Sequence, residues 1–301
     1  MEVGFIGLGN IGGPCAKHLL DAGHRVTVFD IRGDAVERIA QLGARTARSP
    51  ARVAAETGSV FLSLPTPAAA HEVVAGEGGL LESARPGLVV VDLSTNSVGT
   101  ARALFEQCRQ AEVDYLDCPV SGGAWAAERG DLALMPSGDE SAFRRVRDAL
   151  VCFGKDDTQW LGPSGTGTLM KLINNQVFLV ATQVFGEGYL LAAKAGLDVP
   201  RFLEVLRASS AGMYMPLADM IVKRQWESSS YDLSLAEKDL RLALESAAEI
   251  GTPLPLTEAA HGVLARSVEA GLAGKFFIGA MEILEADAGF TAPVPPAMEA
   301  Q

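Results

Sequence analysis

The chain contains few of the residues that form metal centres or disulfide frameworks. Its 301 residues include four cysteines and four histidines, and none of them is grouped at the spacing of metal ligands. A chain of this length can bury a large core without covalent cross-links, so we expect reduced thiols and a cytoplasmic location. The sequence therefore predicts neither a metal site nor a disulfide.

Basic residues are also scarce. The 25 lysines and arginines stand against 37 aspartates and glutamates, which gives a formal net charge of −12. This balance repels a phosphate backbone and disfavours nucleic acid as a partner, although a small anionic ligand is compatible with it. The sequence shows no run of 18 apolar residues and no basic leader with a cleavage site, so we expect a soluble protein without a membrane partner.

Short apolar runs recur through the first 120 residues, and segments of helical length separate them. The runs cover residues 3–7, 26–30, 60–64, 88–92 and 115–120. Strands rich in valine, leucine and isoleucine that alternate with helices are typical of a parallel sheet covered on both faces. The first part of the chain is therefore predicted to be a doubly wound, mainly parallel α/β domain.

Helix periodicity dominates from residue 165 onward. We predict helices over residues 168–195, 199–208, 235–250 and 256–270, with no strand among them. Glycine, proline and serine at residues 162–165 mark the change, which predicts one domain at residues 1–163 and an all-helical domain at residues 164–301. The tail at residues 291–301 contains three prolines and is expected to be loosely held.

A glycine-rich loop follows the first apolar run and precedes a predicted helix. Its first glycine permits a tight turn, the second lets the backbone approach a pyrophosphate, and the third lets the helix pack closely on the sheet. The free amide groups and partial positive charge of the helix N-terminus then favour phosphate binding. The pattern predicts a dinucleotide-binding loop, with a ligand-free turn as the alternative, formed by Gly7, Leu8, Gly9, Asn10, Ile11 and Gly12.

Asp30 ends the second apolar run, 18 residues after Gly12. A carboxylate there can accept hydrogen bonds from both ribose hydroxyls and would repel a 2′-phosphate, which favours NAD over NADP. Arg32 follows closely and leaves NADP possible, and a helix or turn cap is the alternative role for Asp30. Loops after the next two runs should border the cofactor, because ligands of such sheets bind at the carboxyl ends of the strands. Turn chemistry alone could also explain these loop residues, which include Leu64, Pro65 and Thr95.

Two further features favour a substrate site. Ser121, Gly122 and Gly123 follow the last apolar run, where exposed amides and a hydroxyl could bind a carboxylate, with a plain turn as the alternative. Lys171 and Asn175 lie one helical turn apart in an otherwise apolar stretch. Because the surrounding residues are apolar, we expect these two side chains to face a cleft rather than a solvated surface.

Four motifs follow one another along the chain: GFIGLGNIG, DCPVSGG, GTGTLMKLINN and EKDLRLA, at residues 4–12, 117–123, 165–175 and 237–243. In this order they resemble the β-hydroxyacid dehydrogenases, the family of 3-hydroxyisobutyrate dehydrogenase and tartronate semialdehyde reductase. The resemblance implies a Rossmann domain followed by an all-α domain and association into homodimers or homotetramers. It also implies hydride transfer between NAD or NADP and a short β-hydroxy acid or semialdehyde.

The resemblance assigns roles to single residues as well. It implies that Lys171 is the general acid/base, that Asn175 orients the substrate, and that Lys238 comes from the second domain to close over cofactor and substrate. It implies that the substrate carboxylate is held by Ser121, Gly122 and Gly123. Trp125 stands where the family has a small residue, which leaves the shape of the pocket and the identity of the substrate open.

Other chemistries fit the sequence less well. A histidine-based dehydrogenase would need a histidine beside a glycine-rich loop, and His261 in the helical half has none nearby. Oxidative decarboxylation of a sugar-acid phosphate, as in 6-phosphogluconate dehydrogenases, would require clustered basic residues, whereas Arg201, Arg207 and Lys223 are spread out. Imine reductases usually lack the lysine found here at position 171. A non-enzymatic NAD-binding sensor is the remaining alternative.

Overall fold

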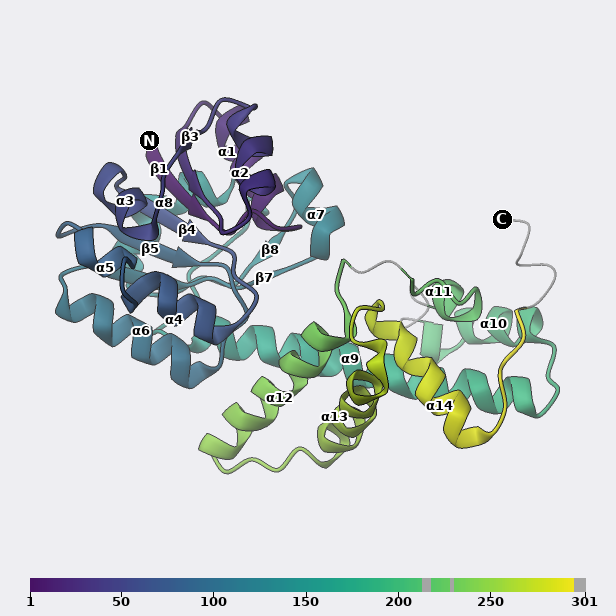
Figure 1. Ribbon diagram of the computed structural model, residues 1–301. Helices are drawn as coiled ribbons and strands as arrows, with labels where there is room; N and C mark the ends of the chain where they lie inside the picture. The colour runs from purple at the N-terminus through teal and green to yellow at the C-terminus, as the bar shows by residue number, and fades with distance from the viewer. Residues whose placement is uncertain (213–217, 228–229, 295–301) are drawn as a thin grey trace. The chain divides into compact units, whose positions relative to one another are not determined.

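The computed structural model describes residues 1–212, 218–227 and 230–294, and it divides into two compact units, Met1–Leu172 and Ile173–Gln301 (Figure 1). The sequence placed the boundary between residues 163 and 164, whereas these units divide within a long helix. The difference has a physical reason, because the first turn of that helix is hydrogen-bonded to strand ends of the first unit.

The first unit is built on a seven-stranded sheet with the order β3-β2-β1-β4-β5-β6-β9. All neighbours are parallel except β6 and β9, which confirms the predicted doubly wound, mainly parallel fold. The strands are β1 (Glu2–Ile6), β2 (Arg25–Phe29), β3 (Arg45–Thr46), β4 (Ser59–Leu62), β5 (Val89–Asp92), β6 (Asp114–Asp117) and β9 (Ser137–Gly138).

The apolar run at residues 115–120 is divided between two sheets. β6 ends at Asp117, and β7 (Val120–Ser121) pairs instead with β8 (Ala133–Leu134) in a separate antiparallel ribbon. Pro119 lies between them and has no backbone N–H to donate to a sheet. The prediction of one continuous strand is therefore wrong at this point, and the break places Ser121 outside the main sheet.

Helices cover both faces of this sheet, as Figure 1 shows. Alternate side chains of one strand enter two different cores: Phe5 belongs to one and Ile6 to the other. This two-sided burial explains why the strands are apolar throughout. The helices are α1 (Gly12–Asp21), α2 (Gly33–Ala40), α3 (Pro50–Glu56), α4 (Pro67–Ala75), α5 (Leu80–Ser83), α6 (Val98–Gln110), α7 (Gly123–Arg129) and α8 (Glu140–Leu150).

The described residues of the second unit form helices and no strand, as predicted. Its core is a single apolar cluster in which Trp226, Leu240 and Phe277 are almost completely buried. The helices are α9 (Thr166–Lys194), whose first turns lie in the first unit, α10 (Val199–Arg207), α11 (Ala218–Val222), α12 (Leu233–Glu249), α13 (Pro255–Ser267), the π-helix η2 (Val268–Leu272), the 3-10 helix η3 (Phe277–Ala280) and α14 (Met281–Ala288).

By length and composition, α9 is the one helix in the described ranges that could cross a membrane. The same test is passed by the core helices of globular proteins. Asn175 and Gln183 on α9 are buried polar residues, and Asn175 is hydrogen-bonded within the second unit. Such partnered polar groups are typical of a helix packed inside a folded domain.

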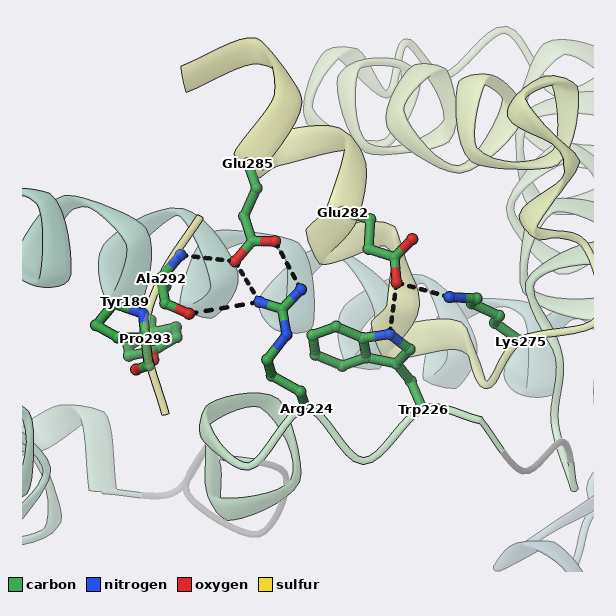
Figure 2. A network of polar contacts seen from close by, with 8 residues as sticks. All are labelled: Tyr189, Arg224, Trp226, Lys275, Glu282, Glu285, Ala292 and Pro293. Atoms are coloured by element: carbon green, nitrogen blue, oxygen red, sulfur yellow. Dashed lines mark hydrogen bonds and ion pairs between the residues drawn. The ribbon is translucent and has the colours of Figure 1, made fainter. Parts of the chain in front are cut away.

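A polar network fastens the end of the described chain to the second unit (Figure 2). Glu285 on α14 is 5% exposed and accepts two hydrogen bonds from Arg224, at 2.5 and 3.0 Å, and one of 2.9 Å from the amide of Ala292. Tyr189 Oη donates to the carbonyl of Pro293 at 3.2 Å. The expectation of a loose tail is therefore wrong for residues 291–294, while residues 295–301 lie outside the described part.

Candidate functional site

The glycine-rich loop joins β1 to α1 at a turn that side chains would block. Gly7 has a φ of +87°, and a Cβ added there would lie 2.2 Å from the carbonyl oxygen of Ser63. A Cβ on Gly12 would lie 1.9 Å from the oxygen of Gly7. A Cβ on Gly9, in contrast, would meet nothing within 4 Å, so its backbone borders open space. This arrangement fits a pyrophosphate at the N-terminus of α1.

Asp30 lies directly beside this loop. Its Oδ2 accepts a 2.6 Å hydrogen bond from the Leu8 amide, and its Oδ1 accepts one of 2.8 Å from the Arg32 amide. The Arg32 side chain approaches the same carboxylate at 3.6 Å. A carboxylate oxygen can accept more than one hydrogen bond, so Asp30 can hold the loop and still receive ribose hydroxyls. The predicted ribose contact stays a prediction.

The loops after β4 and β5 are linked to each other. Asp92 at the end of β5 is fully buried and accepts hydrogen bonds from the Ser94 amide (2.9 Å), from Asn96 Nδ2 (2.8 Å) and from Tyr115 Oη (2.8 Å). The Ser94 hydroxyl in turn accepts from the Leu64 amide at 2.9 Å. Two of the loops predicted to border the cofactor are thereby held in one arrangement, at the carboxyl end of neighbouring strands.

Pro65 and Thr95 lie in these two loops, next to residues of this network. The role of Asp92 was missed, because a buried carboxylate at a strand end cannot be distinguished from a turn residue without its partners. Burial raises the pKa of Tyr115 well above its usual value, and the neighbouring Asp92 adds to the shift. Tyr115 therefore stays a neutral donor to the loop.

Ser121, Gly122 and Gly123, the loop predicted to bind the substrate carboxylate and called the carboxylate loop below, join β7 to α7. Gly122 and Gly123 both have positive φ, of +124° and +66°, so the backbone turns sharply straight after Ser121. Trp125 on α7 is 69% exposed, and the Arg129 guanidinium lies 3.8 Å from the centre of its ring. An exposed indole stacked by a cation so close to the loop can contact a bound molecule, which a core tryptophan could not.

Lys171 and Asn175 are both buried, at 8% and 6% exposure. They lie one turn apart on α9, in agreement with their predicted placement on one side of the helix. Lys171 is the penultimate residue of the first unit and Asn175 belongs to the second. A buried lysine is uncommon, because burial penalises its charge unless the surroundings compensate.

A buried carboxylate contacts two of the predicted site residues of the second unit. Asp239 on α12 is 3% exposed, and its Oδ2 accepts hydrogen bonds of 2.6 Å from Asn175 Nδ2 and of 2.6 Å from Tyr231 Oη. Its Oδ1 lies 3.1 Å from Lys238 Nζ. Two residues predicted separately, Asn175 and Lys238, thus meet at one side chain. Burial raises the pKa of Tyr231 well above its usual value, and the neighbouring Asp239 adds to the shift.

Sequence reasoning missed Asp239 and Tyr231, which contact the predicted site residue Asn175 directly or through the carboxylate. Asp239 follows Lys238 directly in the EKDL motif, which was the only available signal. Nothing in the spacing shows that Tyr231 or Asn175 contacts it, since Asn175 is 64 residues away.

His18 and His261 each have polar contacts of their own in the described structure. His18 Nε2 lies 3.1 Å from the carbonyl oxygens of Ala127 and Glu128, and His261 lies 2.8 Å from Glu237. Among the described residues, no group of three or more His, Cys, Asp or Glu side chains is arranged to hold a metal ion.

Comparisons with known proteins cover nearly the whole chain. The model for the NAD-binding domain of 6-phosphogluconate dehydrogenase matches residues 2–162, and the model for the NAD-binding region of NADP-dependent 3-hydroxyisobutyrate dehydrogenase matches residues 165–281. The probable 3-hydroxyisobutyrate dehydrogenase of Dictyostelium discoideum is 37% identical over 86% of this chain and 83% of its own. The 2-hydroxy-3-oxopropionate reductase of Escherichia coli is 33% identical over 85% of this chain and 88% of its own.

Structural comparison gives the same result. The structure of 3-hydroxyisobutyrate dehydrogenase from Mycobacterium tuberculosis with L-serine superposes with a TM-score of 0.85 and 30% identity, covering 94% of this chain and 98% of that one. The open glycine loop and the model that matches residues 2–162 show that the first unit is a Rossmann domain, and the two matching models together show that the chain binds NAD(P). The chain belongs to the β-hydroxyacid dehydrogenase family.

Proposed function

We propose that the protein is an oxidoreductase that transfers hydride between NAD(P) and a short β-hydroxy acid or the corresponding semialdehyde. The observation that carries the proposal is Lys171, a buried lysine placed one turn before a buried amide within a motif of the family. The enzymes to which the chain is similar are named for 3-hydroxyisobutyrate and 2-hydroxy-3-oxopropionate.

The reaction needs a hydride acceptor and a base. Bound NAD(P) supplies the acceptor of the hydride at its nicotinamide ring. As the C–H bond of the alcohol carbon breaks, Lys171 Nζ takes the hydroxyl proton as a neutral amine, and in reduction its ammonium returns that proton to the oxygen. Ser121, Gly122 and Gly123 bind the substrate carboxylate, and Asn175 orients the substrate through an amide that Asp239 holds.

The proposed substrate class is small and anionic. The Mycobacterium structure contains L-serine, which carries a hydroxyl on the carbon next but one to a carboxylate. A loop of exposed amides with one hydroxyl suits that carboxylate. For the cofactor, we propose a preference for NAD, because Asp30 beside the glycine loop would repel a 2′-phosphate.

We also propose that the protein forms a homodimer or homotetramer in the cytoplasm. Within the second unit, α9 exposes apolar side chains that a second copy could cover: Ile173 (50% exposed), Val177 (58%), Val184 (61%) and Leu191 (72%). Exposed apolar residues in a row along one helix are typical of an association surface. Light scattering coupled to gel filtration measures the oligomeric state directly.

The test of the proposed reaction compares wild type with Lys171→Met in initial-rate assays. The substrates are C3–C5 β-hydroxy acids and semialdehydes, each with NAD and NADP forms. We expect turnover of at least one substrate and a loss of about 10²- to 10⁴-fold in kcat in the variant, the usual size of acid/base catalysis. Lys194→Met, at the exposed end of the same helix, is the control and should keep wild-type kcat. A Lys171→Met enzyme with more than half of wild-type kcat, under conditions where hydride transfer limits the rate, would contradict the assignment.

A further inference from the structure

Asp117, the last residue of β6, is a buried carboxylate surrounded by hydrogen-bond donors. It is 1% exposed and accepts five hydrogen bonds. Oδ1 receives Ser164 Oγ at 3.1 Å and the Gly165 amide at 3.0 Å. Oδ2 receives Ser137 Oγ at 2.8 Å, the Thr168 amide at 3.0 Å and Thr168 Oγ1 at 2.9 Å. The donors come from β9, from Ser164 and Gly165 just before α9, and from the first turn of α9, so one side chain joins β6, β9 and the N-terminal end of α9.

The beginning of α9 also lies in direct contact with the strand ends. The Gly167 amide donates to Ser137 Oγ at 2.8 Å, which links a further amide of the first turn to the Asp117 network. A Cβ on Gly167 would lie 1.9 Å from the carbonyl oxygen of Met135 and 3.1 Å from that of Asp117. Only glycine permits this separation. Close contact and hydrogen bonds therefore fix the same turn independently.

This arrangement exceeds what a helix cap requires. An N-cap side chain ordinarily accepts one hydrogen bond, from an amide two or three residues on. Asp117 instead lies 51 residues from Thr168 and receives amide and hydroxyl donors on both oxygens. Burial raises the pKa of the Asp117 carboxyl, and its hydrogen bonds oppose that shift. The Asp117 side chain therefore fixes the position of the first turn of α9.

Two segments with a proposed function lie next to the Asp117 network along the chain: the part of α9 that carries Lys171, and the carboxylate loop. Lys171 follows Thr168 by three residues, about 4.5 Å along the helix axis, so it stands on the turn that Asp117 holds. The loop of Ser121, Gly122 and Gly123 starts four residues after Asp117 along the chain. Both segments lie in the first compact unit.

We propose that Asp117 is a positioning residue that sets Lys171 relative to the carboxylate loop. The proposal rests on the proposed function, because it assigns to Asp117 the distance between the proton acceptor and the bound carboxylate. A displacement of about 1 Å in such a geometry can cost on the order of 10²-fold in rate.

The test uses Thr168→Val, which removes one hydroxyl donor to Asp117 and keeps the size of the side chain. We expect kcat to fall by roughly 5- to 50-fold, with the Kd of the cofactor within about twofold of wild type, because only the proton acceptor is displaced. The primary deuterium isotope effect on kcat should rise, since hydride transfer becomes more rate-limiting. Thr168→Ser retains the hydroxyl and should restore kcat to within about threefold of wild type.

Thr158→Val is the matched control. Thr158 is a buried threonine of the same unit, and its hydroxyl donates at 2.7 Å to the Lys155 carbonyl, away from the Asp117 network. The Thr158→Val variant loses a comparable hydrogen bond, so any change in its kcat reports the effect of reduced stability alone. We expect wild-type kcat and an unchanged isotope effect. If Thr158→Val loses as much kcat as Thr168→Val, or if Thr168→Val keeps more than half of wild-type kcat, the positioning role is wrong.

Amide hydrogen exchange separates this proposal from the proposed reaction, since it needs no substrate. Thr168→Val should speed exchange at residues 165–168 and leave the amides of β1 unchanged, and unchanged exchange at residues 165–168 would refute the anchor itself. A wild-type protein that turns over no member of the substrate panel refutes the proposed function and with it the positioning role, even where the exchange result holds.

Discussion

Replacing Asp239 with asparagine tests how the second unit holds its polar residues. The substitution keeps the shape of the side chain and removes its charge. The oxygen of the new amide can still accept from Asn175 and Tyr231, while its NH2 group would face the ammonium of Lys238. The variant therefore separates the charge of Asp239 from its size.

The structure gives the magnitude. Asp239 is 3% exposed and the Lys238 side chain 10%, so water screens the ion pair poorly. Breaking a buried pair by neutralising one partner costs about 3–5 kcal/mol of unfolding free energy. Tyr231→Phe removes a single hydrogen bond to the carboxylate and should cost about 1.5–3 kcal/mol. We expect kcat/KM to fall by about 10- to 100-fold in Asp239→Asn, because Lys238 loses its ion pair and the hydrogen bond that orients the Asn175 amide weakens once its acceptor is neutral.

Urea unfolding followed by circular dichroism measures the first quantity, and initial rates with the best substrate of the panel measure the second. Tyr231→Phe is the matched control, since it leaves the charge in place and should keep kcat/KM within about threefold. Equal losses of kcat/KM in the two variants would show that the charge of Asp239 does not hold the site, and the reasoning would fail.

Two further predictions concern stability. Glu285→Gln should lower the unfolding free energy by about 2–4 kcal/mol, because it breaks the buried pair with Arg224; Asp287→Asn, which breaks an exposed pair on the same helix, should leave chemical denaturation almost unchanged. Asp139 caps α8, and a hydrogen bond from Ser141 is the main cause of its lowered pKa, so Asp139→Ala should cost about 1 kcal/mol at neutral pH. The cap is complete above the ordinary carboxyl pKa of 3.8, and the difference between wild type and variant should shrink as pH falls below it; a difference that is constant from pH 7 to 3 would contradict this sign.

The parts of the fold that the sequence predicted are those with a local physical cause. Gly7 and Gly12 are recognisable because their backbone positions exclude every larger residue. The strands of the sheet are recognisable because burial on both faces makes each of them apolar. The all-helical character of the second unit follows from periodicity in the same way.

The parts that were missed depend on residues far apart along the chain. Asp92, Asp117 and Asp239 are buried carboxylates whose importance comes from their donors, and the donors lie up to 64 residues away. A carboxylate at a strand end or on a helix looks like a cap or a surface residue until those partners are known. The division of the compact units inside α9 could not be foreseen for the same reason, since the hydrogen bonds to Asp117 are absent from any local pattern.

The course of α9 decides how the gene can be divided for expression of the nucleotide-binding part alone. A polypeptide that stops at Pro163 would lose four of the five donors to Asp117 and leave an ionisable group in the interior with nothing to replace water. One that continues to Leu172 keeps them all. Truncation at the glycine- and proline-rich linker, the customary choice, would therefore give a poorly soluble fragment, whereas nine more residues would preserve its fold.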